Sequence, residues 1–276
     1  MAQKHSREKK YQGQSALLSR DLLAFYRRVS TSMLTVVDLE TTGSVAEQAR
    51  VIEVSVLQAS LADGVIDQQT YLINPHVKIP DKITQITGIT PSMVGPAPPP
   101  ETVWADCEPL LNKGVLTAHN IDFDYGFLQA EYRRMDSHYY RPPSHRFCTV
   151  ILSRLLLADL PSRRLPKLVK HFGFDVGPSH RAEADTKACW LLAKRLLLKI
   201  QDDSEEDILE CFRQQWIRLQ DAAAILGCRK DQALAQLTTA EIEPRLSKRS
   251  RTPLFRRGPV EDLRVSLQGE QLSVFT

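Results

Sequence analysis

The order of the apolar segments limits the folds open to this chain of 276 residues. Three runs rich in β-branched and other apolar residues come first, and short strand-like and helical segments alternate after them. The expected strands span residues 34–39, 51–61, 70–73 and 115–118, and the expected helices span residues 101–112, 124–135, 149–158, 166–172 and 182–200. This order predicts an α/β domain over residues 31–200, with a β-meander opening a mixed sheet that helices flank.

Four further segments lie outside this domain. Residues 1–30 form a basic extension, in which the first 12 residues are expected to be disordered and a short helix is expected from Ser15. Residues 201–216 hold six Asp or Glu against one Lys or Arg and are interpreted as an acidic linker. Residues 217–267 form a small module, and residues 268–276 form a tail.

Composition excludes several classes of protein. With 42% hydrophobic and 25% charged residues, the chain is globular rather than disordered or collagen-like. It holds no run of 18 uncharged apolar residues, so no membrane partner is expected, and its charged N-terminus does not resemble a secretory signal. The five cysteines are scattered and form no Cys-x-x-Cys pair, which favours a cytoplasmic location.

Asp38 and Glu40 stand two residues apart at the end of the first apolar run, in the sequence VVDLETTG. Side chains two apart on a strand leave the same face. Two carboxylates held side by side repel each other, and a divalent cation between them relieves that repulsion. Gly43 permits the tight turn that follows. Taken alone, the pair also fits a solvated strand end.

Two other motifs place charged residues where helices begin. Asp124, in HNIDFD, follows the strand 115–118, and the N-terminus of a helix stabilises a carboxylate there; an N-cap aspartate is the alternative. His180 and Asp185, in HRAEAD, lead into the helix 182–200. Residues five apart do not share one helical face, so His180 is expected on the incoming loop and Asp185 in the first turn.

In this order, the three motifs resemble those of the DnaQ-like 3′–5′ exonucleases, the Asp-Glu-Asp-Asp-His class that includes the epsilon proofreading subunit of bacterial DNA polymerase III. HNIDFD follows DLETTG after about 80 residues, and HRAEAD follows after about 60 more. The resemblance covers roughly residues 33–200 and extends to INP after the third strand and ITGIT at residues 86–90. It implies a ribonuclease H-like fold, a mixed sheet flanked by helices.

The resemblance also implies an activity, cofactors and site residues. The activity is hydrolysis of the terminal 3′ phosphodiester of DNA, which releases nucleoside 5′-monophosphates and serves proofreading or repair. The implied cofactors are two divalent cations, Mg²⁺ or Mn²⁺, and the implied general base is His180. The implied metal ligands are Asp38, Glu40, Asp124 and Asp185. The implied nucleotide-binding residues are Leu39, Thr41, Thr42, Ile89 and Phe123.

Elementary chemistry agrees with these implied roles. Phosphodiester hydrolysis develops negative charge on the attacking and leaving oxygens, which two cations about 3.5–4 Å apart stabilise. Such hard cations prefer oxygen ligands, and an imidazole, with a reference pKa of about 6.5, accepts protons near neutral pH. His119 and Asn120 match family positions but are expected to shape a turn. Thr87 stands where some relatives carry histidine.

Residues 217–267 resemble the helix-turn-helix of MerR-type or excisionase-type DNA-binding modules. Helices are expected at residues 219–226 and 231–237, with Gly227 making the turn. Residues 245–257 hold six Lys or Arg and no acidic residue, like the basic wing that follows such helices. The resemblance implies a non-specific grip on phosphates; the alternative is a helical appendage with a solvated basic loop.

The tail ends in a sequence that resembles the pentapeptide by which bacterial polymerases and repair proteins bind the sliding clamp. In extended form, Leu272 and Phe275 would fill an apolar pocket and Gln271 would fix the register. The alternation of Leu272 and Val274 also describes an edge strand that closes the small module.

Three alternatives for the whole chain differ in substrate or in class of protein. The first is the DNA exonuclease described above, whose implied partners are single-stranded DNA or 3′ DNA ends, with the sliding clamp and a DNA polymerase as further candidates. The second is an RNA 3′-end trimming exonuclease, because the same fold and ligands serve both. The third is a nucleic-acid-binding regulator without catalysis, against which the complete set of five residues argues.

Overall fold

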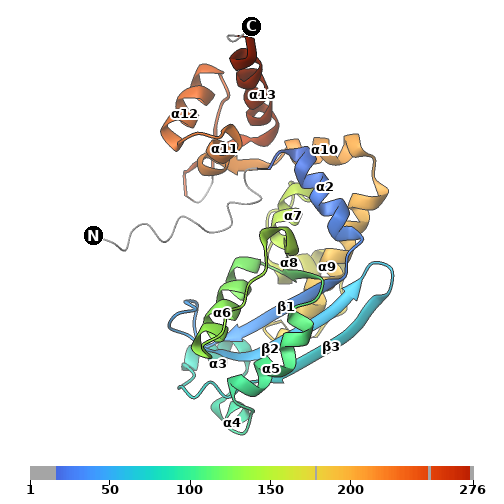
Figure 1. Ribbon diagram of the computed structural model, residues 1–276, viewed down its shortest axis with the longest axis vertical. Coiled ribbons are helices and arrows are strands. Elements are labelled where there is room, and N and C mark those ends of the chain that lie inside the picture. The colour runs from blue at the N-terminus through green and yellow to red at the C-terminus, as the bar shows by residue number, and fades with distance from the viewer. Residues whose placement is uncertain (1–16, 178, 248–249, 274–276) are drawn as a thin grey trace, which may run out of the picture. The chain divides into compact units, whose positions relative to one another are not determined.

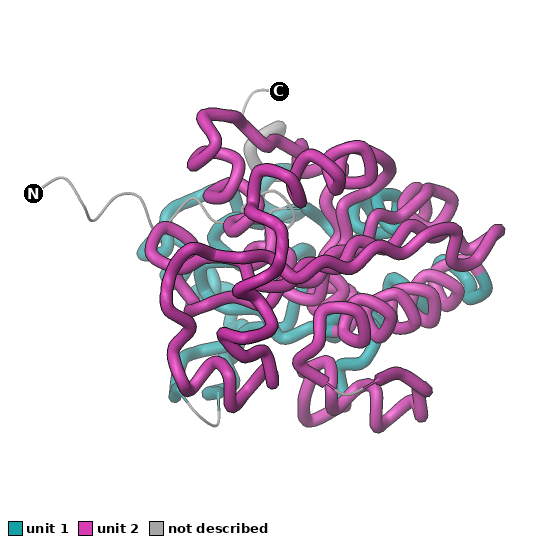
Figure 2. The backbone as a smooth tube through the Cα atoms, turned by 90° about the horizontal axis from the view of Figure 1, so that it is seen from below, with its two compact units in different colours: residues 1–26, 154–159, 202–276 teal, residues 27–153, 160–201 magenta. Residues whose placement is uncertain are grey.

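The computed structural model describes residues 17–177, 179–247 and 250–273 (Figure 1). The chain divides into two compact units (Figure 2). The large unit contains residues 27–153 and 160–201, and the small unit contains residues 1–26, 154–159 and 202–276. The expected disorder of residues 1–12 lies outside the described residues. Among the residues described, none of the helices is long and apolar enough to cross a membrane.

The sheet of the large unit has five strands in the order β3-β2-β1-β4-β5. β1, β2 and β3 form the expected antiparallel meander, and β4 and β5 continue the sheet in parallel from β1. Their bounds are β1 (Leu34–Thr41), β2 (Val51–Ser60), β3 (Gly64–Leu72), β4 (Val115–Ala118) and β5 (Arg146–Cys148). The mixed sheet is confirmed, although β5, only three residues long, was not predicted.

Every helix expected in the large unit is present, with ends displaced by a few residues. These helices are α5 (Pro100–Leu111), α6 (Ile121–Arg134), α7 (Thr149–Leu156), α8 (Leu165–Phe172) and α9 (Ala182–Asp202). The structure adds α3 (Asp81–Thr87), α4 (Pro91–Val94) and the 3₁₀ turn η1 (Pro143–His145). Gly88 ends α3 with a left-handed φ of 73°, and Pro91 begins α4, so both breaks follow from residue chemistry.

The first four residues of β1 are fully buried, and Asp38 is the first residue of the strand to reach solvent. Val36 and Val37 point to opposite faces of the sheet and are both buried, because helices cover the sheet. The apolar run therefore fixes β1 in the centre of the sheet, and its end delivers polar side chains to the surface.

The small unit corrects the interpretation of residues 201–216 as a linker. Most of them form α10 (Glu205–Arg213), which Ser204 caps by accepting the backbone N–H of Asp207 at 3.2 Å. Ile208 and Phe212 are fully buried, and the Phe212 ring lies 6.1 Å from the ring of Tyr26 in α2 (Ser19–Ser30). The acidic residues are the solvated face of an amphipathic helix.

The module that follows contains two short helices at the expected positions and a small sheet. α11 (Leu219–Leu226) and α12 (Lys230–Thr239) flank Gly227, whose φ is 71°. β6 (Trp216–Arg218), β8 (Pro253–Arg256) and β7 (Arg245–Leu246) form a three-stranded sheet in that order. Ile217, Ile225, Leu237, Phe255 and Val260 form the core between helices and sheet.

Helix α13 (Arg257–Ser273) was not expected and corrects the interpretation of the tail. Gln271 and Leu272 belong to its last turn, so the alternative of an edge strand is wrong for residues 271–273. Val274 and Phe275 lie outside the described residues.

Candidate active site

Asp38 and Glu40 reach the same face of β1, as the strand period predicts. Both are half-buried, whereas Leu39 between them is buried on the opposite face. The register of β1 with β2 shifts after Glu40, between Glu40 and Thr41, so the pairing becomes irregular where the carboxylates emerge.

Asp124 joins these carboxylates from the first turn of α6 and is 3% exposed. Asn120, whose φ is 89°, turns the chain from β4 into this helix. The Asp124 carboxylate accepts hydrogen bonds from backbone N–H groups, including that of Leu39. This bond ties the start of α6 to the end of β1 that carries Asp38 and Glu40.

His180 and Asp185 come from the start of α9, on the loop and in the first turn as expected. The His180 N–H donates to Asp185 Oδ2 at 2.8 Å, and the imidazole is exposed. Among the described residues, Glu40, His180 and Asp185 form a cluster whose potential ligand atoms all lie within 4.8 Å of one another. Residues about 140 positions apart in the sequence thus meet at one point.

The electrostatics of the cluster are those of like charges held together. Burial, followed by the charges of Asp124, Asp185 and Glu40, raises the pKa of Asp38 well above its ordinary value. Burial and then Asp185 raise the pKa of Glu40 to about 7. Burial also raises the pKa values of Asp124 and Asp185. The folded chain therefore resists holding all four carboxylates ionised at neutral pH.

These residues fit a site for divalent cations. Carboxylate oxygens are the ligands that Mg²⁺ and Mn²⁺ prefer, and bound cations would remove the repulsion that raises the carboxylate pKa values. Asp38, Glu40, Asp124 and Asp185 are the residues that would hold them.

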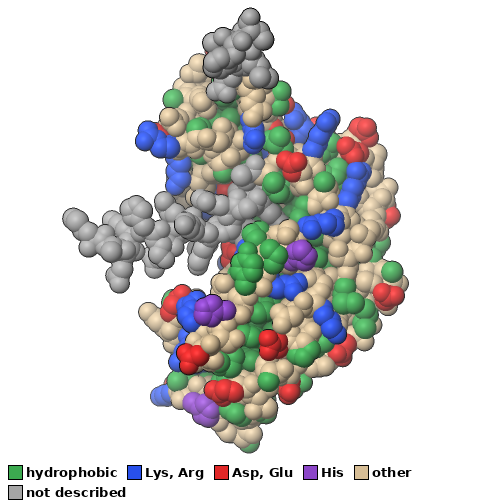
Figure 3. Space-filling view, in the orientation of Figure 1, with side chains coloured by type: hydrophobic (Ala, Val, Ile, Leu, Met, Phe, Trp, Pro, Cys, Tyr) green, Lys and Arg blue, Asp and Glu red, His purple; other side chains and the backbone are tan. Residues whose placement is uncertain are grey.

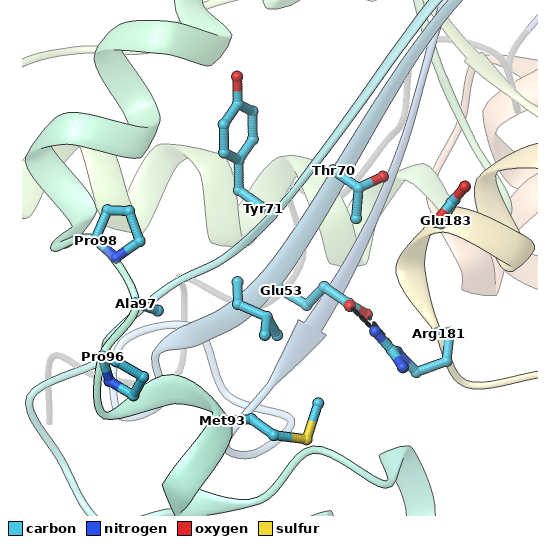
Figure 4. A pocket seen from close by; sticks show the side chains of 10 residues that line it. Glu53, Thr70, Tyr71, Met93, Pro96, Ala97, Pro98, Arg181 and Glu183 are labelled. Atoms are coloured by element: carbon cyan, nitrogen blue, oxygen red, sulfur yellow. Dashed lines mark hydrogen bonds and ion pairs between the residues drawn. The ribbon is translucent and has the colours of Figure 1, made fainter.

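The family resemblance did not indicate two residues that join the site, Glu53 and Arg181. Glu53 lies opposite Glu40 in the register of β1 and β2, and Arg181 follows His180. Their side chains point toward each other on one side of a pocket whose other wall includes Met93, Pro96 and Pro98 (Figure 4). The sequence held one indication of this pair. Glu53 lies inside the apolar run 51–61, and a carboxylate buried in such a run requires a partner.

The expected nucleotide contacts have mixed outcomes. Ile89 is 0% exposed and packs with Ile52, Ile79 and Val94, so its side chain offers no surface to a nucleotide and that expectation is wrong. The Leu39 side chain is likewise buried. The ITGIT and DLETTG matches gave positions in the sequence but did not reveal which way the side chains face.

The remaining candidates line the loop after β1 and the start of α6. Thr41 donates to the Gly43 carbonyl at 2.7 Å, and Thr42 accepts the Arg50 N–H at 2.9 Å, so both hydroxyls shape the loop. Phe123 is half-buried, and its ring lies 4.9 Å from that of Phe127. Phe123 is therefore the best placed of the five candidates to offer a side-chain surface to a base or sugar.

His119 holds the turn before α6 in place, as expected. Its two ring nitrogens lie 2.9 Å from the Thr149 hydroxyl and 2.8 Å from the Arg163 carbonyl. Both ring positions are thus engaged within the fold.

The mixed sheet, with carboxylates and a histidine gathered at the end of its central strand, defines a nuclease domain of the Asp-Glu-Asp-Asp-His type. The family model RNase_T, described as exonuclease, matches residues 35–193. The chain therefore belongs to this exonuclease family.

Curated relatives match the same region. The PolC-type DNA polymerase III of Oceanobacillus iheyensis is 32% identical over 177 residues, which cover 63% of this chain and 12% of the polymerase. That of Clostridium perfringens is 31% identical over 183 residues, 66% of this chain and again 12% of the polymerase. The chain thus matches about an eighth of these much longer proteins.

Solved structures share the fold. Exonuclease I of E. coli in complex with a dT13 oligonucleotide aligns with a TM-score of 0.55 and 21% identity, over 60% of this chain and 41% of that chain. The nuclease domain of 3′hExo, a DEDDh family member bound to rAMP, aligns with a TM-score of 0.51 and 19% identity, over 60% of this chain and 92% of that one.

Proposed function

We propose that this protein is a metal-dependent 3′–5′ exonuclease that hydrolyses the terminal phosphodiester of DNA and releases nucleoside 5′-monophosphates. The observation that carries the proposal is the meeting of Glu40, His180 and Asp185 beside the carboxylates of Asp38 and Asp124. The PolC-type relatives and the DNA-bound exonuclease I support DNA as the substrate.

Each residue of the cluster has a distinct task in this proposal. Asp38, Glu40, Asp124 and Asp185 would hold two Mg²⁺ or Mn²⁺ ions. Such ions, when bound, stabilise negative charge on the attacking and leaving oxygens. His180, exposed beside Asp185, would accept the proton of the attacking water, and its N–H bond to Asp185 orients the residue.

A cleavage assay tests polarity, metal and product together. Single-stranded DNA labelled at the 5′ end should shorten as a ladder, DNA labelled at the 3′ end should release its label in the first step, and a chelator should stop both reactions. Uncut DNA in Mg²⁺ and in Mn²⁺ would favour the regulator without catalysis. Matched and mismatched 3′ ends should be compared, because proofreading predicts faster removal from the mismatch.

RNA trimming is the second candidate, and the likeness to a nuclease domain bound to rAMP favours it. DNA and RNA strands of equal length and sequence should be compared under the same conditions. A larger kcat/KM on RNA would replace the DNA assignment without affecting the catalytic residues.

We assign DNA binding to the C-terminal module, and the outer face of its sheet is the surface that favours this. The Arg256 guanidinium lies 4.2 Å and that of Arg245 lies 5.5 Å from the centre of the Trp216 ring. Ile217 and Phe255 alternate with these residues and face the core. Elsewhere, on the face drawn in Figure 3, the two signs of charge are interspersed, so phosphate binding depends on local groups such as these.

The salt dependence of DNA affinity distinguishes the sheet from helix α12. Arg245→Ala and Arg256→Ala should each weaken binding to every sequence and reduce the slope of log K against log salt by about 1. Lys230→Ala, at the start of α12, should have the smaller effect. The reverse order would move the interface to α12, and no effect from any variant would favour the helical appendage.

The tail is proposed to bind the bacterial sliding clamp through Gln271, Leu272 and Phe275. Its last described residues form the final turn of α13, so binding in extended form requires this turn to unwind, and terminal turns fray readily. The full chain should bind the clamp and a chain ending at Gly269 should not. Equal binding by both would disprove the motif.

Two features of the cellular setting complete the proposal. All five cysteines are free, which fits a reducing cytoplasm. A DNA polymerase is a further proposed partner, because the first curated relatives are PolC-type polymerases. Co-purification with and without the tail would show whether a polymerase binds directly or through the clamp.

A further inference from the structure

Glu53 is a carboxylate within a long buried strand of the large unit. Residues 51–59 of β2 are all buried, and Glu53 is 1% exposed. It lies directly across from Glu40 in the strand register, so the two side chains share one face of the sheet. Burying a carboxylate costs free energy unless partners compensate it, and its partners therefore indicate its role.

Glu53 binds the start of α9 at two points. The Arg181 guanidinium donates from Nη2 to Oε1 at 2.7 Å and from Nε to both carboxylate oxygens at 3.2 Å. The backbone N–H of Ala182 donates to Oε2 at 2.8 Å. A planar guanidinium on a planar carboxylate fixes direction as well as distance, so β2 holds this backbone in one orientation (Figure 4).

The same short segment carries two members of the candidate active site. His180 precedes Arg181 and has a left-handed φ of 66°, a conformation that persists in a non-glycine residue only where neighbours enforce it. The Asp185 N–H donates to the Arg181 carbonyl at 3.0 Å, and Asp185 Oδ2 accepts the His180 N–H at 2.8 Å. A displacement of Arg181 would therefore displace both residues.

We propose that the Glu53–Arg181 pair is a positioning device for the nuclease. Glu53, fixed in β2, holds the backbone that sets His180 and Asp185 opposite Glu40 on β1. The inference rests on the proposed exonuclease activity. A misplacement of about 1 Å in a catalytic geometry can reduce the rate about 100-fold. Loss of the pair should therefore lower kcat by about 10- to 100-fold and leave the KM for single-stranded DNA within about twofold.

Two variants break the pair without removing a metal ligand or the proposed base. Glu53→Gln keeps the shape and one acceptor for Ala182, and Arg181→Lys keeps the charge but loses the planar fork. Arg181 is 41% exposed, so its replacement should fold even if Glu53→Gln does not. The matched control is Arg213→Lys in the small unit, which alters a 2.7 Å pair with Asp262 and should leave kcat unchanged.

Amide hydrogen exchange supplies a readout that does not need activity. In both variants the backbone amides of Ala182 and Asp185 should exchange about 10- to 100-fold faster. The Ala182 N–H loses or loosens its bond to the Glu53 carboxylate, and the Arg181 carbonyl that accepts the Asp185 N–H is no longer held in place. Amides in the middle of α9 should keep their rates. Unchanged exchange in the variants would overturn the positioning role whether or not the protein cleaves DNA.

The kinetic outcomes separate this role from its competitors. A raised KM with unchanged kcat would mean that Arg181 binds the DNA itself, and positioning would be wrong. The double variant should lose no more than the worse single variant, because both act on one device; additive losses would also overturn it. If the wild-type chain cleaves nothing, the proposed function fails, and hydrogen exchange still decides the structural claim.

Discussion

One buried ion pair in the small unit and one carboxylate cluster in the large unit hold charge in opposite ways. In the small unit, Arg257 is 4% and Glu261 is 7% exposed, and they form a 3.1 Å ion pair. Glu261 also accepts the N–H and the hydroxyl of Ser19, both at 2.9 Å, and Arg257 donates to the Leu17 carbonyl at 2.8 Å. In the large unit, the half-buried Asp38 lies among carboxylates of its own sign.

This difference separates structural charge from functional charge. The Arg257–Glu261 pair has no net charge and is hydrogen-bonded, so each partner compensates a charge that would otherwise be buried alone. The carboxylate cluster opposes the fold that holds it, because burial and repulsion both disfavour ionisation. Replacing a residue of the pair should therefore cost stability and spare cleavage, whereas replacing a residue of the cluster should do the reverse.

The largest effect is expected at Asp38. Asp38→Asn should abolish cleavage, because it removes one of the four carboxylates proposed to hold the cations. The metal-free variant should be more stable than the wild type, because it lacks a carboxylate that burial and repulsion disfavour. Nuclease assays and chemical denaturation measure the two quantities. Asp122→Asn is the matched control and should keep its activity. Retained activity in Asp38→Asn would show that the Asp38 carboxylate is not required for cleavage.

His180→Ala should lower kcat by about 10²–10⁴-fold, the usual contribution of a general base. Its side chain is exposed, so the free energy of unfolding should change little. His145→Ala, at another exposed histidine, should leave kcat unchanged. A His180 variant with wild-type kcat would assign the proton transfer to another group.

Glu261→Ala should destabilise the small unit by about 3–5 kcal/mol, because it leaves the Arg257 charge buried without its carboxylate. The neighbouring exposed pair supplies the control. Asp262→Ala removes the partner of Arg213, and such surface pairs contribute about 1 kcal/mol or less. Equal losses of unfolding free energy in the two variants would mean that burial does not determine how much an ion pair contributes to stability.

The sequence was sufficient for the elements and residues that local patterns determine. The end of β1, the start of α6 and the start of α9 each carry their motif within a few residues, so Asp38, Asp124 and Asp185 could be located without a structure. Gly227 likewise marked the turn between α11 and α12. Period and turn chemistry act over short distances, and these predictions required nothing more.

Features that depend on distant contacts could not be predicted in the same way. Glu53 and Arg181 meet across 128 positions, and neither neighbourhood identifies the other. Ile89 matches a family motif, but its burial depends on packing against Ile79 and Val94. In α10 the many acidic residues suggested a linker, although Ile208 and Phe212 lie one helical turn apart and form a buried face.

The smallest predicted effect concerns the pH dependence of the free energy of unfolding, to which the carboxylate cluster should contribute and the ion pair should not. The ordinary pKa of a glutamate near 4.5 is raised to about 7 at Glu40, first by burial and then by Asp185 and Glu53. Because the folded state binds the proton more tightly than the unfolded state, the stabilisation is complete below pH 4.5 and is lost as pH rises through about 7.

The free energy of unfolding of the metal-free protein should therefore fall across this window, with Glu40 contributing about 2 kcal/mol after allowance for its partial exposure. Glu40→Gln should flatten the dependence, because the variant has no proton to lose. Mg²⁺ should reverse the fall at pH 7 and above in the wild type, since a cation favours the ionised carboxylates.

Glu261→Gln should lower stability yet keep the same pH slope, because the carboxylate cluster is intact. Denaturant titrations from pH 4 to pH 8, with and without Mg²⁺, measure all of these quantities. If the free energy of unfolding of Glu40→Gln changed with pH as in the wild type, the repulsion among the carboxylates would not contribute to the stability of the fold.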